Sequence, residues 1–194
     1  MPRAFASAIC VSLVFIAACT TTSKTLADRH DGYEVPIARD VILTLPKRPG
    51  LAEPFSESQT LIGNYDGQTK AFQAHVTSEP DKFSVVLLTV SGPRIMNIDW
   101  TADGIEQERF IIAPDELDAL NILADIFLVR WPEGIIRAAL PAGAELKVSE
   151  TSRMVERDDM TLVEIDYGLE DNKGRSYNRL VNQERQYSLS IYTE

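Results

Sequence analysis

The sequence predicts a mainly β, α+β fold in which one long antiparallel sheet curls around a helix. From residue 59 onward, about ten short strand patterns alternate with turn residues. Neighbouring strands joined by such short turns must be antiparallel, and a sheet of this length usually curls. The one long helical pattern is apolar on nearly all sides, so we expect it to be buried in the concave side of the sheet.

Five strand candidates precede the helical pattern. Phe72, Ala74 and Val76 alternate with polar residues, as in a strand with one buried face. Asp66-Gly67 has the composition of a hairpin turn. The predicted strands are residues 60–65, 68–77, 83–90, 94–100 and 105–112.

The hydrophobic period changes after the fifth strand. Pro114-Asp115-Glu116 predicts a helix start, because proline suits the first helical position and acids suit the positive end of the helix dipole. Apolar residues then recur every three or four positions as far as Trp131, and Pro132 ends the pattern. A second short helix is expected over residues 132–140. The strands predicted after it are 144–149, 152–156, 161–167, 179–183 and 187–192.

Residues 1–18 are typical of a bacterial signal peptide: Arg3 gives a positive start and an uncharged, largely apolar run follows. Ile16-Ala17-Ala18-Cys19 resembles the bacterial lipobox, in which a peptidase cleaves before a cysteine that accepts diacylglycerol. We therefore expect a lipid-modified Cys19 at the start of the mature chain. Cys10 fits less well, because the residue before it is a bulky isoleucine. An ordinary secretory signal with a chance cysteine is the alternative.

The expected anchor suggests a location and a domain plan. Two or more acyl chains hold a protein firmly on a bilayer. In such lipoproteins an Asp after the cysteine often signals inner-membrane retention, so Thr20 implies the periplasmic face of the outer membrane. No later segment reaches the roughly 20 apolar residues of a transmembrane helix. Residues 19–58 are predicted to be the lipidated cysteine plus a tether with one short strand at 41–45, and residues 59–194 to be a single β-rich domain.

Charge and composition argue against several functions. The chain has 19 Lys and Arg against 29 Asp and Glu, a net charge of −10, which repels nucleic acid. Once Cys19 is acylated, His30 and His75 are too few ligands for a zinc site. The chain has no Gly-x-Ser-x-Gly elbow and no Gly-rich phosphate loop. We expect no nucleic-acid partner, no metal, no cofactor and no enzymatic activity.

The segment 123–132 (LADIFLVRWP), followed by Ile136-Arg137, resembles the "LADLxLxxWP" and "LR" motifs of an uncharacterised family of small outer-membrane lipoproteins. That family is often found beside aryl-polyene and fatty-acid-type biosynthesis genes. Residues 163–167 (VEIDY) are similar to its "VxIxY" strand, and Ile136 replaces the expected Leu. The order of elements resembles the lipoprotein-carrier fold of the Lol system. The resemblance implies a half-open antiparallel β-barrel, with a helix plugging its concave side and a hydrophobic cavity.

Two groups of residues are candidates for the site. Asp125 lies within the apolar helix, where it either points out through an exposed strip or pairs with Arg130 or Arg137 to fix the helix. Large apolar side chains could line a cavity, since methionine and aromatic rings adapt to varied ligands. The alternative is that they form a packed core. These cavity candidates are Met96, Trp100, Leu120, Leu123, Phe127 and Trp131.

The expected function is to bind or transfer a lipophilic small molecule or acyl chain in the periplasm, with the covalent lipid holding the protein on the membrane. The alternative is a non-enzymatic accessory subunit that docks another cell-envelope protein.

Overall fold

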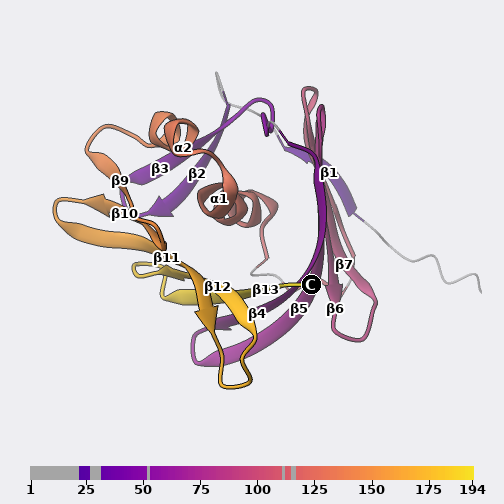
Figure 1. Ribbon diagram of the computed structural model, residues 1–194. Coiled ribbons are helices and arrows are strands. Elements are labelled where there is room, and N and C mark those ends of the chain that lie inside the picture. Colours follow the sequence, from indigo (N-terminus) through magenta and orange to yellow (C-terminus); the bar gives the residue numbers. More distant parts are fainter. Residues whose placement is uncertain (1–21, 27–31, 52, 111, 115–116) are drawn as a thin grey trace, which may run out of the picture.

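The computed structural model describes residues 22–26, 32–51, 53–110, 112–114 and 117–194, so Cys19 lies outside the described residues. Eleven strands form one antiparallel sheet that does not close into a barrel. The sheet curls around helix α1 (Ala119–Arg130), which occupies its concave side (Figure 1). The predicted α+β class, with a half-open sheet and helices, is confirmed.

The sheet consists of two meanders. They run from β4 to β8 and from β9 to β13, and they meet where β4 pairs with the C-terminal strand β13, with Leu61 opposite Ile191. β1 adds to the outer edge of the first meander, beside β8. The order in space is β1-β8-β7-β6-β5-β4-β13-β12-β11-β10-β9. The strands are β1 (Thr22–Leu26), β4 (Phe55–Tyr65), β5 (Gln68–Glu79), β6 (Lys82–Thr89), β7 (Arg94–Thr101), β8 (Gly104–Arg109), β9 (Ala144–Val148), β10 (Ser152–Arg157), β11 (Met160–Glu170), β12 (Ser176–Asn182) and β13 (Tyr187–Thr193).

The predicted tether over residues 19–58, with one short strand at 41–45, contains further strands. β1 pairs with β8 at the edge of the main sheet, and a separate hairpin includes the predicted strand. β2 (Gly32–Ala38) and β3 (Val41–Pro46) pair with each other and pack against both helices. Val41, Leu43 and Leu45 are completely buried, whereas Ile42 between them is 44% exposed. This is the alternation of a strand with one face in the core. The prolines around these residues suggested a linker, but residues 32–46 belong to the folded domain.

Helix α1 begins later than the sequence suggested. Its N-cap is Asp118, whose carboxylate accepts a hydrogen bond from the Asn121 backbone N–H at 3.0 Å, and Ala119 is the first helical residue. This capping bond places the start several residues after Pro114. The second helix, α2 (Glu133–Ala139), follows directly after Pro132. Among the described residues, no helix is long and apolar enough to cross a membrane.

An aromatic cluster fixes the C-terminal end of α1 against the sheet. The Trp131 ring lies 5.2 Å from Phe83 and stacks on Trp100 at 5.7 Å. Its indole N–H donates to the Pro49 carbonyl at 2.6 Å, so the tryptophan also holds the segment that leaves the hairpin. The Arg153 guanidinium donates to carbonyls at the end of the helix, including that of Leu128 at 3.0 Å, where a cation complements the helix dipole.

Candidate ligand-binding cavity

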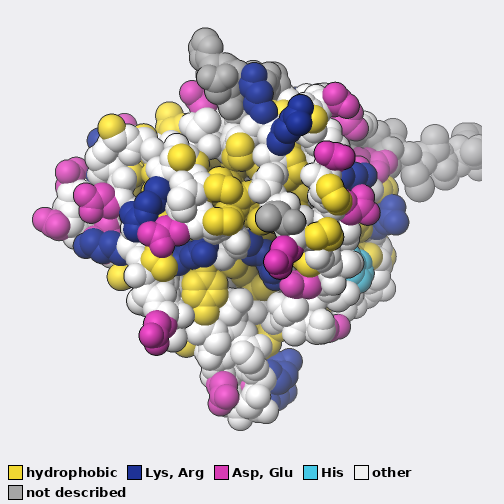
Figure 2. Space-filling model, turned by 45° about the horizontal axis from the view of Figure 1, so that its top comes forward, with side chains coloured by type: hydrophobic (Ala, Val, Ile, Leu, Met, Phe, Trp, Pro, Cys, Tyr) yellow, Lys and Arg dark blue, Asp and Glu magenta, His cyan; other side chains and the backbone are white. Residues whose placement is uncertain are grey.

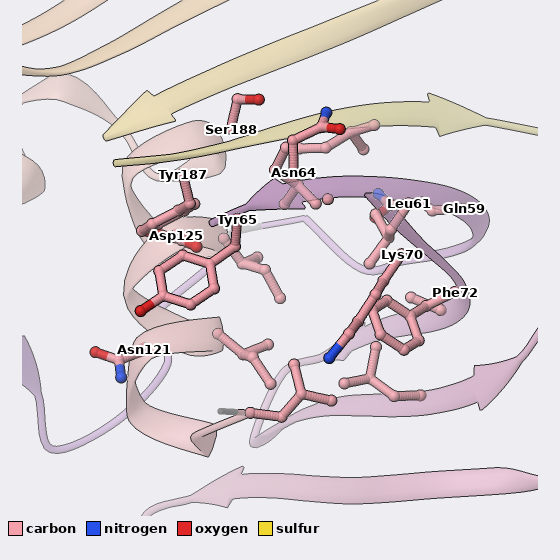
Figure 3. Close-up of a pocket in the computed structure, with 18 of the residues that line it drawn as sticks. Gln59, Leu61, Asn64, Tyr65, Lys70, Phe72, Asn121, Asp125, Tyr187 and Ser188 are labelled. Carbon is pink, nitrogen blue, oxygen red and sulfur yellow. Dashed lines mark hydrogen bonds between the residues drawn. The ribbon is translucent and has the colours of Figure 1, made fainter. Parts of the chain in front are cut away.

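A cavity of about 680 Å³ lies between α1 and the concave face of β4, β5, β6 and β13. Figure 3 shows it from the side, with α1 on the left and the strands on the right. Its volume falls within the roughly 300–1,000 Å³ of small-molecule sites. The wall is mainly apolar, formed by Leu61, Phe72, Ala74, Val76, Val85, Leu87, Leu117, Ile122, Ile126, Val129, Leu189 and Ile191.

The cavity follows from the spacing of residues on both walls. On β5 and β6, side chains two residues apart point to the same face, so Phe72, Ala74 and Val76 face α1 together. On α1, Ile122, Ile126 and Val129 lie on one helical face. The residues of α1 and its N-cap that line the cavity extend from Asp118 to Arg130, about 18 Å at 1.5 Å per residue. The result is an elongated apolar chamber.

None of the six predicted lining residues faces this cavity. Met96, Trp100, Leu123, Phe127 and Trp131 are at most 1% exposed in the packed core, and Leu120 packs against that core. The structure thus agrees with the alternative, in which these six residues form a packed core. The helix is apolar all round because one face packs against the core while the other lines the cavity. The hydrophobic period of the sequence could not show which face of α1 packs against the core and which lines the cavity.

Polar side chains cluster at one place on the cavity wall. The Tyr187 hydroxyl, from the start of β13, donates to the Asp125 carboxylate at 2.6 Å. The Arg185 guanidinium donates to the Asn121 side-chain carbonyl at 2.8 Å. Asn121 and Asp125 are one helical turn apart, and Arg185 and Tyr187 come from the β12–β13 connection. The two bonds tie the middle of α1 to the sheet, and all four residues line the cavity.

The surroundings of Asp125 favour its uncharged form. Burial raises the pKa of Asp125 from its ordinary value to about 7, although the hydrogen bond from Tyr187 and the charge of Arg185 act in the opposite direction. Burial also raises the pKa of Tyr187, and the neighbouring Asp125 adds to the effect. Near neutral pH, Asp125 therefore exchanges between a carboxylate and a neutral carboxyl that donates a hydrogen bond.

Asp125 makes neither of the two arrangements expected for it. Arg130 pairs instead with Glu57 on β4: both of its terminal guanidinium nitrogens donate to the carboxylate, one of them at 3.0 Å. Arg137 pairs with Glu133 one turn away on α2. Asp125 does not lie on an outward-facing strip either: it is half-buried, lines the cavity and accepts a hydrogen bond from Tyr187. The sequence flagged the right residue but gave no sign of a partner 62 positions away.

Other chemistry is sparse in the described part of the chain. No three His, Cys, Asp or Glu side chains there lie close enough together to hold a metal ion. His75 accepts or donates a hydrogen bond with Ser58 at 2.9 Å, but both side chains are at an exposed position away from the cavity. His30 and Cys19 lie outside the described residues. Figure 2 shows one face of the surface, where hydrophobic side chains gather between charged ones.

A family model described as "Protein of unknown function (DUF3261)" matches residues 56–194, which is more than half of the chain. The chain therefore belongs to this uncharacterised family. A comparison with curated proteins gives no match. The matched region begins at β4 and contains the cavity and both helices.

Proposed function

We propose that this member of the DUF3261 family is a binding protein, without enzymatic activity, that holds or transfers a lipophilic molecule in the periplasm. The observation that carries the proposal is the apolar cavity of about 680 Å³ between α1 and the sheet. The resemblance to outer-membrane lipoproteins and to the Lol-system carrier fold, stated from the sequence, points in the same direction.

The hollow on the concave side of the sheet is partly open, and its wall is mainly apolar. A well-formed apolar hollow with a few polar groups is typical of a ligand-binding site. A wall of leucine, isoleucine and valine gains dispersion contacts and loses water contact when an apolar molecule fills the space. The elongated shape, along one whole face of α1, favours a chain-like molecule such as an acyl or polyene chain.

The lipid anchor expected at Cys19 would keep this cavity close to a membrane. β1 begins at Thr22 and pairs with β8 along the sheet edge. Three residues span at most about 11 Å when fully extended. A chain anchored at Cys19 would therefore hold the start of β1, at one edge of the sheet, within about that distance of the bilayer surface, and the domain would stay beside the membrane. We place the anchored protein on the periplasmic face of the outer membrane.

Filling the cavity tests the proposal. Residues 20–194, which contain the whole described fold, are purified and their lipophilic cargo is identified by native mass spectrometry. Binding of a neutral fluorescent hydrophobic dye gives the affinity. Ile126→Trp places an indole in the cavity and should lower dye affinity at least about tenfold.

Val86→Trp is the matched control, because Val86 alternates with the cavity-lining Val85 and Leu87 and lies on the other face of β6. Its dye affinity should stay close to that of the unmodified protein. If the unmodified protein carries no lipophile and binds none from an envelope lipid extract, the proposal fails. Docking of another envelope protein then becomes the better hypothesis.

A further inference from the structure

The cavity wall contains an arginine whose side-chain hydrogen-bond partner is neutral. Arg185 lines the wall, and its one side-chain hydrogen bond among the described residues goes to the neutral amide of Asn121. No carboxylate of the described residues lies within ion-pair distance of it. Other arginines of this acidic chain pair with carboxylates instead: Arg130 with Glu57, Arg137 with Glu133, Arg175 with Asp171 and Arg179 with Asp166.

The acid nearest to this cation compensates its charge only while it is ionised. Asp125 feels the charge of Arg185 but directs one oxygen to the Tyr187 hydroxyl, and burial favours its uncharged form. As a neutral carboxyl it donates a hydrogen bond and does not repel an anion. The guanidinium, the Asn121 amide and the Asp125 carboxyl thus offer positive charge and donors on an otherwise apolar wall.

A second cation lies on the opposite wall. Figure 3 shows the Lys70 side chain projecting from β5 into the cavity. Lys70 is exposed and already takes part in an interaction, so Arg185 is the cation available for a bound anion. Of the other charged residues of the wall, Arg130 pairs with Glu57, Asp118 caps α1, and Asp66 is exposed at the β4–β5 turn.

We propose that the molecule held in this cavity is an amphiphile with one anionic oxygen head group, a carboxylate or a phosphate, and that Arg185 binds this group beside Asn121 and Asp125. The inference rests on the proposed function, since it assigns the polar end of the lipophilic ligand. The apolar chain lies along Ile122, Ile126 and Val129. Guanidinium groups bind carboxylate and phosphate with paired hydrogen bonds, which gives Arg185 the chemistry for both.

A series of ligands with the same chain tests the head group. Dodecanoate, dodecyl phosphate, dodecanol and dodecylamine displace a neutral hydrophobic dye from residues 20–194 at about pH 6, where Asp125 is mainly protonated. We expect one or both anions to bind at least about tenfold more tightly than dodecanol. Preference between the two anions identifies a free acid or a phosphate-bearing lipid as the source. Tighter binding of dodecylamine, or equal binding of dodecanol and both anions, would overturn the inference.

Variants then locate the head group. Arg185→Gln should remove most of the preference for the anion and leave dodecanol affinity within about twofold, whereas Arg185→Lys should keep part of the preference. Arg179→Gln is the control, because Arg179 pairs with Asp166 and is exposed outside the cavity. An unchanged anion preference in Arg185→Gln overturns the assignment even if the preference itself is real. If no ligand of the series binds, the proposed function fails instead.

Discussion

Asp125 should make the stability of this protein depend on pH in the neutral range. The pKa of Asp125 is raised to about 7 in the folded protein, against about 3.9 for an unperturbed aspartate. Between these values the folded protein holds a proton that the unfolded chain has released. The stabilisation is therefore fully present below about pH 4 and is lost as the pH rises through about 7.

The size of the effect follows from the same shift. In that window, the free energy of unfolding falls by about 1.4 kcal/mol for each pH unit. From about pH 5 to about pH 8 this amounts to roughly 3 kcal/mol. Asp125 is half-buried and meets the cavity, so water reduces the loss and we expect about 2 kcal/mol.

Asp125→Asn removes the titration but keeps an oxygen that accepts the hydrogen bond from Tyr187. Urea unfolding at a series of pH values should show the unmodified protein losing about 2 kcal/mol more than Asp125→Asn between about pH 5 and about pH 8. Asp66→Asn is the matched control, because Asp66 also lines the cavity but lies exposed at a turn, with a positive φ of 49° that asparagine tolerates. Parallel pH profiles for the unmodified protein and Asp125→Asn would refute the reasoning.

Three further predictions concern the frame around the cavity. Trp131→Phe should lower the free energy of unfolding, measured in urea, by about 2–3 kcal/mol, because it removes the donor to the Pro49 carbonyl and leaves space in the core. A loss below about 1 kcal/mol would mean that this hydrogen bond does not stabilise the fold. Gly32→Ala should lower the free energy of unfolding by about 1–3 kcal/mol in the same assay, because a Cβ would collide with the Leu45 backbone carbonyl across the hairpin. An unchanged unfolding midpoint would contradict the close pairing of β2 with β3. Cys19→Ser should abolish acylation, so that mass spectrometry finds no lipid adduct and fractionation finds the protein outside the membrane; a variant that still carries the lipid would exclude the lipobox assignment.

Local patterns were enough to locate the strands. Every strand from β4 to β13 corresponds to a segment predicted from alternation and turn residues, with ends that shift by only a few positions. The reason is that strand alternation and hairpin turns involve neighbours in sequence. In the hairpin β2–β3, the strand at 41–45 was predicted, but its partner β2 was missed because the prolines nearby indicate an extended linker equally well. Only the contacts of the hairpin with α1 and α2 show that its apolar face is in the core.

The cavity required information that no local pattern contains. A helix with apolar residues all round predicts burial, and α1 is buried, but Phe127 faces packed side chains while Ile126 beside it faces a hollow. The same holds for the polar cluster, since Arg185 and Tyr187 reach α1 only because β13 pairs with β4 and closes the two meanders into one sheet.

The sequence by itself determined the fold class, the order of strands and helices from β4 onward, and the burial of α1, because each depends on hydrophobic period and turn chemistry within short segments. It also singled out Asp125 as an unusual acid. Only the tertiary structure decided which face of α1 borders a cavity and which partners Asp125 and Arg185 have. These depend on how the sheet curves and on residues that are far apart along the chain, and neither curvature nor long-range pairing is encoded in the period of any one segment.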